Sequence, residues 1–318
     1  MLCKVTVGIE NGHVKLVGEV YMVGIAIINY KTFKKTIECI NSIRDTIMSD
    51  YKIYLLENGS DNESASILEE TYIDADDVEL IISDKNHGYA RGNNICINKM
   101  IEDGCDVAVI SNNDIICSDN AIDLLVEDLK NNKDYIIFGP RIVSPDGIFQ
   151  NSVKENRYTN FEYLKKSTYL ANFFKKEITQ ENRKNEMINK KTDVSWVSGA
   201  FFACDLPKMR EIGFFDKNTF LFFEEYILSE KAIKKGYKLG YEPNAIVVHY
   251  HAVSTGGGLN IVSKKFADES EMYYFKTYTN KSKMFMIALR MIRSLEVIYT
   301  FGKRKEWKSI KYYFYREV

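Results

Sequence analysis

The sequence predicts an α/β fold, in which a doubly wound, mostly parallel sheet is followed by a helical appendage at the C-terminus. Short apolar runs alternate with amphipathic stretches through residues 23–131, which indicates strands joined by helices. The apolar runs are continuous rather than alternating, as in strands that helices cover on both faces. After residue 263, Lys and Arg outnumber Asp and Glu and are interleaved with aromatic and aliphatic residues. This last pattern predicts the appendage.

Each element follows from its local hydrophobic period. Continuous apolar runs predict strands at 23–28, 51–56, 78–82, 107–110, 135–138 and 245–249, and a glycine-bearing strand region at 194–203. Apolar residues at helical spacing predict helices at 34–47, 64–72, 92–102, 120–131 and 224–235. The polar stretch 151–191 is expected to form a helical or mobile excursion, and Thr255-Gly256-Gly257-Gly258 a flexible loop.

These elements divide the chain into three parts. Residues 1–21 form an N-terminal extension or extra hairpin, because three glycines interrupt short β-prone pieces. Residues 22–262 form the main domain, with halves at 22–130 and 131–262, and residues 263–318 form the appendage. The 318 residues, 45% of them hydrophobic, are enough to bury a full core.

Composition narrows the function classes. The formal net charge of -1 gives no global positive field, so no nucleic-acid partner is expected. Six scattered cysteines without a CxxC pair indicate small core residues of a reducing compartment. Charged residues interrupt the apolar stretches before Val23, so no signal peptide is expected, and no run reaches the length of a membrane span. A cytoplasmic location follows as an expectation.

The loops after the strands are polar, and ligands of such sheets bind beyond the carboxyl ends of the strands. The most informative loop is Asn112-Asn113-Asp114, where an apolar strand runs into two amides and a carboxylate. A carboxylate there can hold a divalent cation that binds a diphosphate. The alternative is a simple turn, since Asn and Asp bond their own backbone.

Several motifs stand in a fixed order along the chain. They are Glu57-Asn58-Gly59-Ser60-Asp61, Asn86-His87-Gly88-Tyr89-Ala90 with Asn93 and Asn94, Asn112-Asn113-Asp114, Trp196-Val197-Ser198-Gly199-Ala200, Ile212-Gly213-Phe214-Phe215-Asp216, Phe222-Phe223-Glu224-Glu225, and His249 with Ser254. This order resembles glycosyltransferase family 2, the inverting nucleotide-sugar enzymes of GT-A fold, and in particular its rhamnosyltransferase-like branch. The resemblance runs from about Val23 to Ser254.

The resemblance implies that residues 22–130 bind the nucleotide-sugar donor. Glu57 would accept a hydrogen bond from the imide of uracil or thymine, with Tyr30 against the base. Other donor contacts would come from Asn58, Asn86, Arg91, Asn94, Asn112 and Asn113, although Arg91 reads equally well as a solvated surface residue. Asp114 would bind Mg²⁺ or Mn²⁺, and His249 would complete the metal shell, with His251 as a competitor.

The resemblance also implies that residues 131–262 bind the acceptor. Glu225, beside Glu224, would be the general base, although two acids at a helix start are also common for electrostatic reasons. Trp196, Ser198 and Gly199 would contact the sugars, although Ser198 and Gly199 are equally consistent with simple close packing. Other aromatic residues could also stack on acceptor sugars, while most of them are expected in the core: Phe214, Phe215, Phe220, Phe222 and Phe223. This sequence departs from the family at two positions, because Glu225 replaces an Asp and Ile227 replaces an acid.

The expected function is therefore inverting transfer of a sugar, from dTDP-rhamnose or a UDP-hexose, to a glycan or lipid-linked acceptor in surface polysaccharide biosynthesis. The two departures leave open a relative that binds without turnover. A dinucleotide oxidoreductase is disfavoured, since no glycine fingerprint follows the first strand. The basic, apolar appendage is expected to contact the inner face of the membrane, pack on the domain, or form a homodimer.

Overall fold

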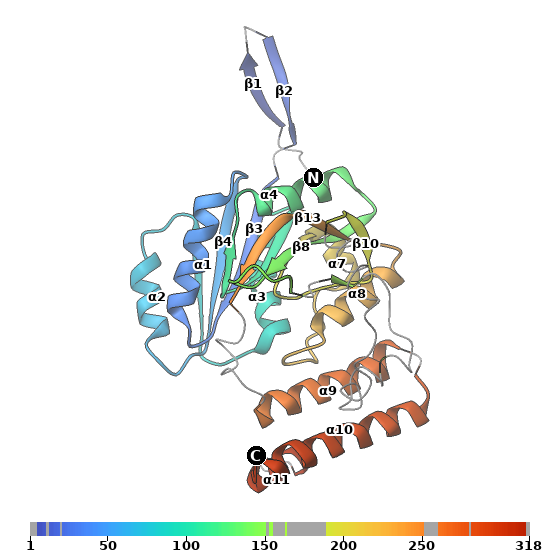
Figure 1. The fold of residues 1–318 in the computed structure, drawn as a ribbon. Helices are drawn as coiled ribbons and strands as arrows, with labels where there is room; N and C mark the ends of the chain where they lie inside the picture. Colours follow the sequence, from blue (N-terminus) through green and yellow to red (C-terminus); the bar gives the residue numbers. More distant parts are fainter. Residues whose placement is uncertain are drawn as a thin grey trace.

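The computed structural model describes residues 5–10, 13–19, 21–150, 153–154, 163, 189–250, 260–279 and 281–315. Most of the predicted excursion at 151–191 and the predicted loop at 255–258 lie outside these residues. A hairpin of β1 (Val5–Glu10) and β2 (His13–Glu19) stands at one end of an α/β body, and three helices lie at the other end (Figure 1).

A nine-stranded sheet forms the centre of the body, in the order β10-β13-β8-β12-β6-β3-β4-β5, with β7 paired to β13. Its strands are β3 (Val23–Asn29), β4 (Tyr51–Asn58), β5 (Val78–Ser83), β6 (Val107–Asn112), β7 (Ile115–Cys117), β8 (Tyr135–Val143), β10 (Thr192–Val194), β12 (Phe201–Asp205) and β13 (Lys238–His249). The strands β12, β10 and β7 run antiparallel to their neighbours. The other six point the same way, which confirms a mostly parallel sheet.

Helices cover both faces of this sheet. They are α1 (Phe33–Thr46), α2 (Ser64–Tyr72), α3 (Gly88–Glu102), α4 (Ala121–Asn131), α7 (Leu206–Ile212) and α8 (Glu224–Lys234). Side chains alternate along β3, so that Ile25 packs with α1, α2 and α4 on one face. Ala26 packs with α3, α7 and α8 on the other. These two buried cores confirm the doubly wound arrangement.

Sequence periodicity found these elements but misjudged some of their ends. The strand predicted at 245–249 begins at Lys238, because Pro243 and Asn244 interrupt the apolar pattern where the register shifts between Glu242 and Ile246. The strand region predicted at 194–203 is three short strands, one of which is β11 (Trp196–Val197), paired with β9 (Val153–Lys154). The five described cysteines are buried and free, as the scattered spacing predicts.

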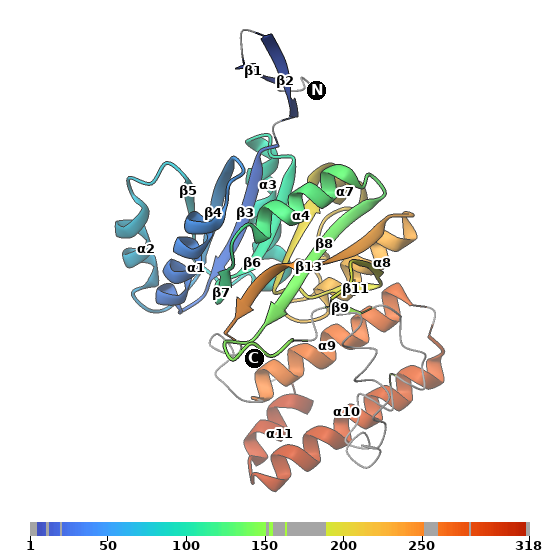
Figure 2. The same ribbon diagram turned by 45° about the horizontal axis from the view of Figure 1, so that its top comes forward.

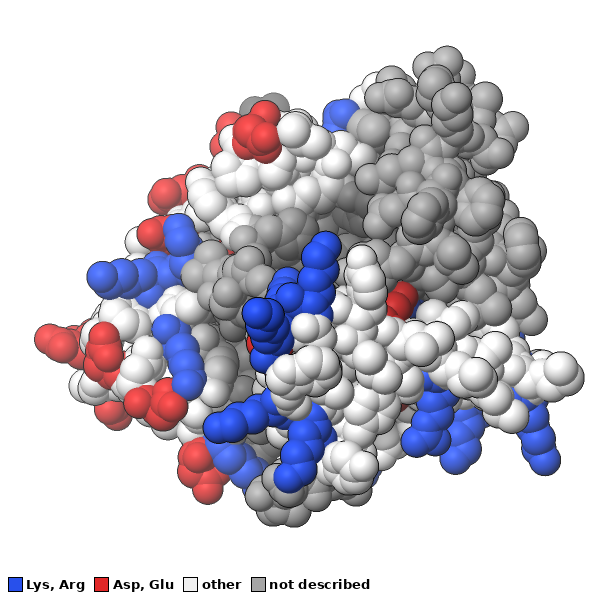
Figure 3. All heavy atoms as spheres, turned by 60° about the horizontal axis from the view of Figure 1, so that its bottom comes forward, with Lys and Arg blue, Asp and Glu red and all other residues white. Residues whose placement is uncertain are grey.

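Three C-terminal helices complete the molecule: α9 (Ile261–Tyr278), α10 (Lys283–Lys303) and α11 (Trp307–Phe314). The predicted boundary after residue 262 falls within the first turn of α9. Figure 2 shows these helices lying beyond the carboxyl ends of β8 and β13, and Figure 3 views the molecule from this end. Among the described residues, no helix combines the length and apolar character needed to cross a bilayer.

Ile227 joins the helical appendage to the main domain. It is fully buried on α8 and packs in one cluster with Tyr274 and Phe275 of α9 and with Phe285 and Leu289 of α10. An acid at this position would lie buried in an apolar cluster, at a large desolvation cost. The packing of this appendage therefore accounts for the departure from the family pattern at Ile227.

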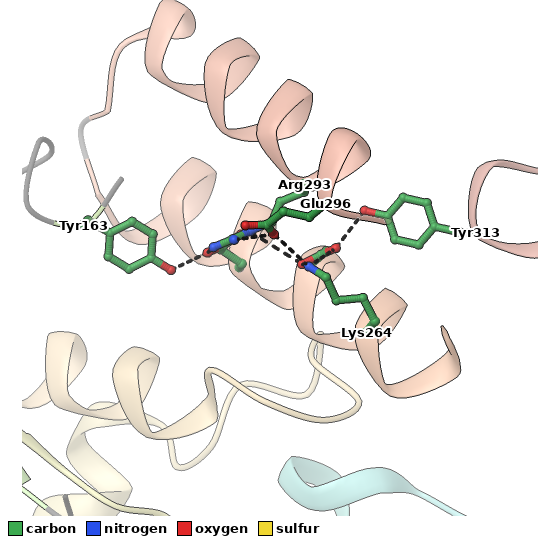
Figure 4. A network of polar contacts seen from close by, with 7 residues as sticks. Tyr163, Lys264, Arg293, Glu296 and Tyr313 are labelled. Carbon is green, nitrogen blue, oxygen red and sulfur yellow. Dashed lines mark hydrogen bonds and ion pairs between the residues drawn. The ribbon is translucent and has the colours of Figure 1, made fainter. Parts of the chain in front are cut away.

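A network of ion pairs holds the three C-terminal helices together (Figure 4). The Arg293 guanidinium donates to both carboxylate oxygens of Glu271 at 2.6 and 2.7 Å, and to Glu296 at 2.8 Å. Lys264 and the hydroxyl of Tyr313 both bind Asp268, at 2.5 and 2.8 Å. Buried charges are stable only when paired in this way, so the network fixes the register of the helices.

Candidate active site

A cleft of about 710 Å³ lies at the carboxyl ends of β3, β4 and β6, between them and the starts of α8 and α9. Its described lining is Ile28, Tyr30, Asn58, Asn86, Gly88, Tyr89, Asn93, Ser111, Asn112, Asn113, Asp114, Ser198, Gly199, Ala200, Phe220, Leu221, Phe222, Glu224, Glu225, His249, Asn260, Val262, Ser263 and Phe266. Eleven of the fifteen residues predicted for the site are among them. The cleft is thus the place where the predicted site residues meet.

Glu57 lies just beneath the cleft lining. Parallel pairing places it directly opposite Asn29 at the sheet edge, where it is 1% exposed. It accepts hydrogen bonds from the amide of Asn29 at 2.5 Å and from the backbone N–H of Ser60 at 2.6 Å. Tyr30 follows Asn29 into the cleft, and the Lys31 ammonium lies 5.1 Å from the centre of its ring. Glu57 therefore supports the loops that carry Tyr30 and Ser60.

Asn58 and Asn86 brace the loop that leads into α3. The Asn58 amide donates to Asn86 at 3.0 Å, and its carbonyl accepts from the backbone N–H of His87 at 2.9 Å. Asn86 also accepts from the N–H of Gly88 at 2.8 Å. Gly88 has φ +73°, and an added Cβ would lie 2.2 Å from the carbonyl oxygen of Phe220. Only glycine allows this close approach of the two loops.

Asp114 and His249 meet in the cleft although they are far apart in sequence. The antiparallel pairing of β7 with β13 places His249 opposite Ile115, next to Asp114. The His249 Nε2 atom lies 3.2 Å from an Asp114 carboxylate oxygen, and both side chains are 7% exposed. The other ring nitrogen lies 3.1 Å from the side-chain oxygen of Gln150. Because that oxygen only accepts, the Nδ1 atom carries hydrogen and Nε2 is directed at Asp114.

The donor set of this corner suits a divalent cation. An imidazole and a carboxylate face the same point, and His249 has a second partner that orients its ring, as metal-ligating histidines commonly do. No Lys or Arg occurs among the described residues along the cleft, so they offer a diphosphate no cationic side chain. The described residues also hold no group of three or more His, Cys, Asp or Glu side chains placed to bind one metal ion. The other ligands would be phosphate oxygens and water molecules, because Mg²⁺ usually keeps several of its waters.

Glu224 and Glu225 begin α8 on the other side of the cleft. Phe222 and Phe223 before them both have left-handed backbone, with φ +72° and +67°, a costly conformation for bulky residues. Burial raises the pKa of Glu225 to about 7. Burial, and then the charge of Glu225, raises the pKa of Glu224 to about 8. Each of these two adjacent carboxyls can therefore take up or release a proton near neutral pH, which is what a general base requires.

Gly199 leaves room for chemistry beside Glu225. The Tyr89 hydroxyl donates to the carbonyl oxygen of Gly199 at 2.5 Å. A Cβ added at Gly199 would lie 3.0 Å from that hydroxyl and 3.8 Å from a carboxylate oxygen of Glu225. Ser198 lines the same wall, and its hydroxyl accepts from the backbone N–H of Ala200 at 3.2 Å. The small side chains at 198–200 keep this wall open.

Asn112 and Asn113 line the cleft before Asp114, whereas Arg91 and Asn94 do not. The side-chain amide of Asn113 donates to the hydroxyls of Thr32 and Thr36 at 2.7 and 2.9 Å, which fixes this turn on α1. Arg91 donates to the carbonyl of Lys217 at 2.8 Å, and Asn94 makes two bonds to the backbone of Phe215. Their bonds join α3 to the loop before α8.

Trp196 lines a second cavity, of about 310 Å³, rather than the cleft. Its ring stacks on Tyr226 with centroids 5.2 Å apart. The residues that sequence reasoning missed include Tyr89, Phe266, which stacks on Phe220 at 4.6 Å, and the start of α9 at Asn260 to Ser263. Tyr89 and the glycine before it belong to a recognised motif, but no sequence signal placed α9 against the cleft.

Comparisons with known proteins agree with this fold. Residues 24–200 match the family model described as Glycosyl transferase family 2. An N-acetylglucosaminyl-diphospho-decaprenol L-rhamnosyltransferase of Mycobacterium tuberculosis is 24% identical over 213 residues, which are 64% of this chain and 68% of that protein. An uncharacterized glycosyltransferase of Acanthamoeba polyphaga mimivirus is 24% identical over 148 residues, 44% of this chain and 55% of its own.

Two solved structures share the fold. One is GalNAc-T7 with UDP, GalNAc and Mn²⁺, with a TM-score of 0.60 and 14% identity. The match covers 92% of this chain but only 58% of that one. The other is a mannosyltransferase from Pyrobaculum calidifontis with GDP-Man and Mn²⁺, with a TM-score of 0.55 and 12% identity, covering 90% of this chain and 73% of that one. Both likenesses show the predicted GT-A fold.

Proposed function

Because the chain belongs to glycosyl transferase family 2, we propose that its cleft transfers a sugar from a nucleoside diphosphate sugar to a hydroxyl of a glycan or lipid-linked acceptor. The observation that carries this proposal is the meeting of Asp114 and Glu225, from distant parts of the chain, in one cleft. In this proposal residues 22–130 hold the donor, and residues 131–262 with the start of α9 hold the acceptor.

The donor lies along the carboxyl ends of β3, β4 and β6. Tyr30 packs against the base, with Glu57, Asn58 and Asn86 shaping the pocket around it, and Asn112 bonds the ribose or sugar. Asp114 and His249 hold a divalent cation, Mg²⁺ or Mn²⁺, which when bound neutralises charge on the departing diphosphate. The absence of Lys and Arg from the described cleft lining supports this need for a cation.

The acceptor approaches along Ser198 and Gly199. Its oxygen forms the new bond to the anomeric carbon on the face opposite the diphosphate, and the old bond from that carbon to a diphosphate oxygen breaks. The electron pair of the old bond leaves with the nucleoside diphosphate, and the acceptor proton passes to Glu225. Glu225 suits this role because its raised pKa makes it a stronger base than an exposed carboxylate.

The proposed donor is dTDP-rhamnose or a UDP-hexose, and the proposed setting is cytoplasmic synthesis of a bacterial surface polysaccharide. The name of the mycobacterial relative, an L-rhamnosyltransferase that acts on a decaprenol-linked sugar, supports a rhamnosyl donor and a lipid-linked acceptor. A relative that binds without turnover is the alternative. Ile227 does not favour it, because this residue lies in an apolar cluster and outside the described cleft lining.

The test measures nucleotide release and glycan product with Mn²⁺, a polyprenyl diphosphate N-acetylglucosamine acceptor, and dTDP-rhamnose, UDP-sugars and GDP-mannose in turn. The parent chain should turn over one donor, and Asp114→Ala and Glu225→Gln should lose at least 100-fold in kcat. Glu211→Gln is the matched control, because Glu211 is about half exposed on α7 and lines neither cavity. A parent no faster than its cleft variants with every donor would leave a binding module.

A further inference from the structure

The outward side of α10 is apolar along its whole length. Met284, Ile287, Met291, Leu295 and Ile298, which we call the α10 stripe, are exposed, from 46% at Ile298 to 81% at Met284. Steps of three and four residues place all five on one side of the helix. Isolated exposed apolar residues are ordinary, but five in a row along one helix form a contiguous patch that indicates an interaction surface.

The outer side of α10 is more apolar than that of a helix facing water. Its inner side contains Arg293 and Glu296, which join the ion network, besides Phe285, Leu289 and Val297 of the buried seam. A surface helix normally turns its charged residues outward and its apolar residues inward. The inner side thus combines a buried apolar seam with two paired charges, while the outer side still carries the apolar α10 stripe, so the outer side is suited to an apolar environment.

Exposed aromatic and cationic residues also lie at the end of α10 and on α11. Trp307, Tyr312, Phe314 and Tyr315 are exposed on and just after α11, and Trp and Tyr favour the boundary between lipid and water. Between residues 281 and 315 the exposed charged residues are all cationic: Lys283, Arg290, Lys303, Arg304, Lys305, Lys308 and Lys311. The only acids there are Glu296, bound to Arg293, and Glu306, and neither is fully exposed.

The arrangement of charge identifies the occupant of this face. Figure 3 shows Lys and Arg beside uncoloured surface on this end of the molecule, whereas most visible acids gather toward the side of α2. A second copy of the chain would bring two cationic surfaces together and would be repelled. A partner that is apolar inside and anionic at its rim fits both features, and the leaflet of an anionic bilayer has this construction.

We propose that the α10 stripe inserts among the headgroups of an anionic membrane leaflet, with the surrounding Lys and Arg side chains on lipid phosphates. This goes beyond transfer chemistry, and it rests on the proposed function only for its consequence. The start of α9 lines the cleft, and α10 packs on α9, so docking would hold the cleft beside the membrane. A lipid-linked acceptor would then meet its catalyst at the surface in which it is anchored.

The test is flotation of the full chain with vesicles of phosphatidylcholine alone and with 30% phosphatidylglycerol. We expect at least tenfold stronger binding to the anionic vesicles, weakened by raising NaCl from 50 to 500 mM. The double variant Met291→Glu and Leu295→Glu should bind at least tenfold less. The matched control is Met48→Glu with Ile73→Glu, two similarly exposed apolar residues far from α10.

Thermal unfolding and donor turnover with a water-soluble acceptor should be the same in the parent, the stripe variant and the control. Loss of flotation with unchanged turnover would support the proposal and leave the catalytic function standing by itself. Equal flotation of parent and stripe variant, or no flotation of the parent with anionic vesicles, would overturn it. A parent dimer in sedimentation experiments that the stripe variant dissociates would also overturn it, by assigning the stripe to a second copy.

Discussion

Glu225 should make the transfer rate depend on pH in a range where an ordinary glutamate would not. Burial raises the pKa of Glu225 from 4.5 to about 7. A base acts only when deprotonated, so the active fraction rises from about one tenth at pH 6 to about nine tenths at pH 8. At a pKa of 4.5 the carboxyl would already be almost fully ionised at pH 6. We therefore expect kcat/KM to rise about tenfold between these pH values.

The assay is release of nucleoside diphosphate at subsaturating donor from pH 5.5 to 8.5, with parent, Glu225→Gln and Glu211→Gln. The Gln variant should lose 100-fold to 10,000-fold at pH 8 and show no rise, because an amide takes up no proton from the acceptor. The Glu211 variant should follow the parent curve. A flat parent profile, or a Glu225→Gln variant within tenfold of the parent, would refute the assignment of Glu225 as base.

The same burial predicts an opposite effect on stability. The folded state binds a proton at Glu225 more tightly than the unfolded chain, so stability falls as the pH rises from about 4.5 to about 7 and stays at the lower value above that. Glutamine carries no charge at any pH. Glu225→Gln should therefore gain about 2 kcal/mol relative to the parent between pH 5 and pH 8, a value reduced for the partial exposure of this side chain. Urea unfolding at the two pH values measures it, and equal differences at both would contradict the buried charge.

Three further predictions concern other parts of the molecule. Asp114→Asn and His249→Gln should each weaken Mn²⁺-dependent donor binding at least tenfold in calorimetric titrations, because each removes a proposed ligand, and unchanged Mn²⁺ dependence would count against the site. Gly199→Ala should lower kcat about tenfold, since the added Cβ would lie 3.0 Å from the Tyr89 hydroxyl. Adding Tyr89→Phe to this variant should restore part of the rate, and no recovery would argue against this contact. Arg293→Met should reduce the free energy of unfolding by about 3–5 kcal/mol because it leaves the buried Glu271 carboxylate without its cationic partner, whereas exposed Arg290→Met should change it by less than about 0.5 kcal/mol. Equal losses in urea titrations would contradict the network.

The donor side of the cleft was predictable because it depends on local pattern. Apolar strands fixed the sheet, and the parallel pairing of β3 with β4 and β6 brings Tyr30, Asn58 and Asn112 to one edge. That inference needs only the rule that strand ends face the ligand. Whether these residues bind the donor stays a prediction, but the structure does place them around one cleft.

The rest depends on contacts that no local pattern specifies. Asp114 meets His249 through a pairing of β7 with β13, across more than a hundred residues. Arg91 and Asn94 follow a strand at the start of a helix, where phosphate is often bound, yet both bind the backbone of a distant loop. The apolar residues of α10 could be read as one core-facing stripe, whereas Phe285 is buried and Met284 beside it is 81% exposed. Burial depends on which elements pack against a helix, and the hydrophobic period of the sequence does not specify those elements.

The two walls of the cleft come from different stretches of the polypeptide, residues 28–114 on one side and mainly 198–266 on the other. If the second wall binds the acceptor, as proposed, mutations there should alter which molecule is glycosylated while the nucleotide still binds to the first wall. The family model matches residues 24–200, a span that includes the whole first wall and only the start of the second. We expect homologues of this chain to diversify by exchanging recipients more readily than by exchanging activated sugars, with α9 as the segment where that divergence concentrates.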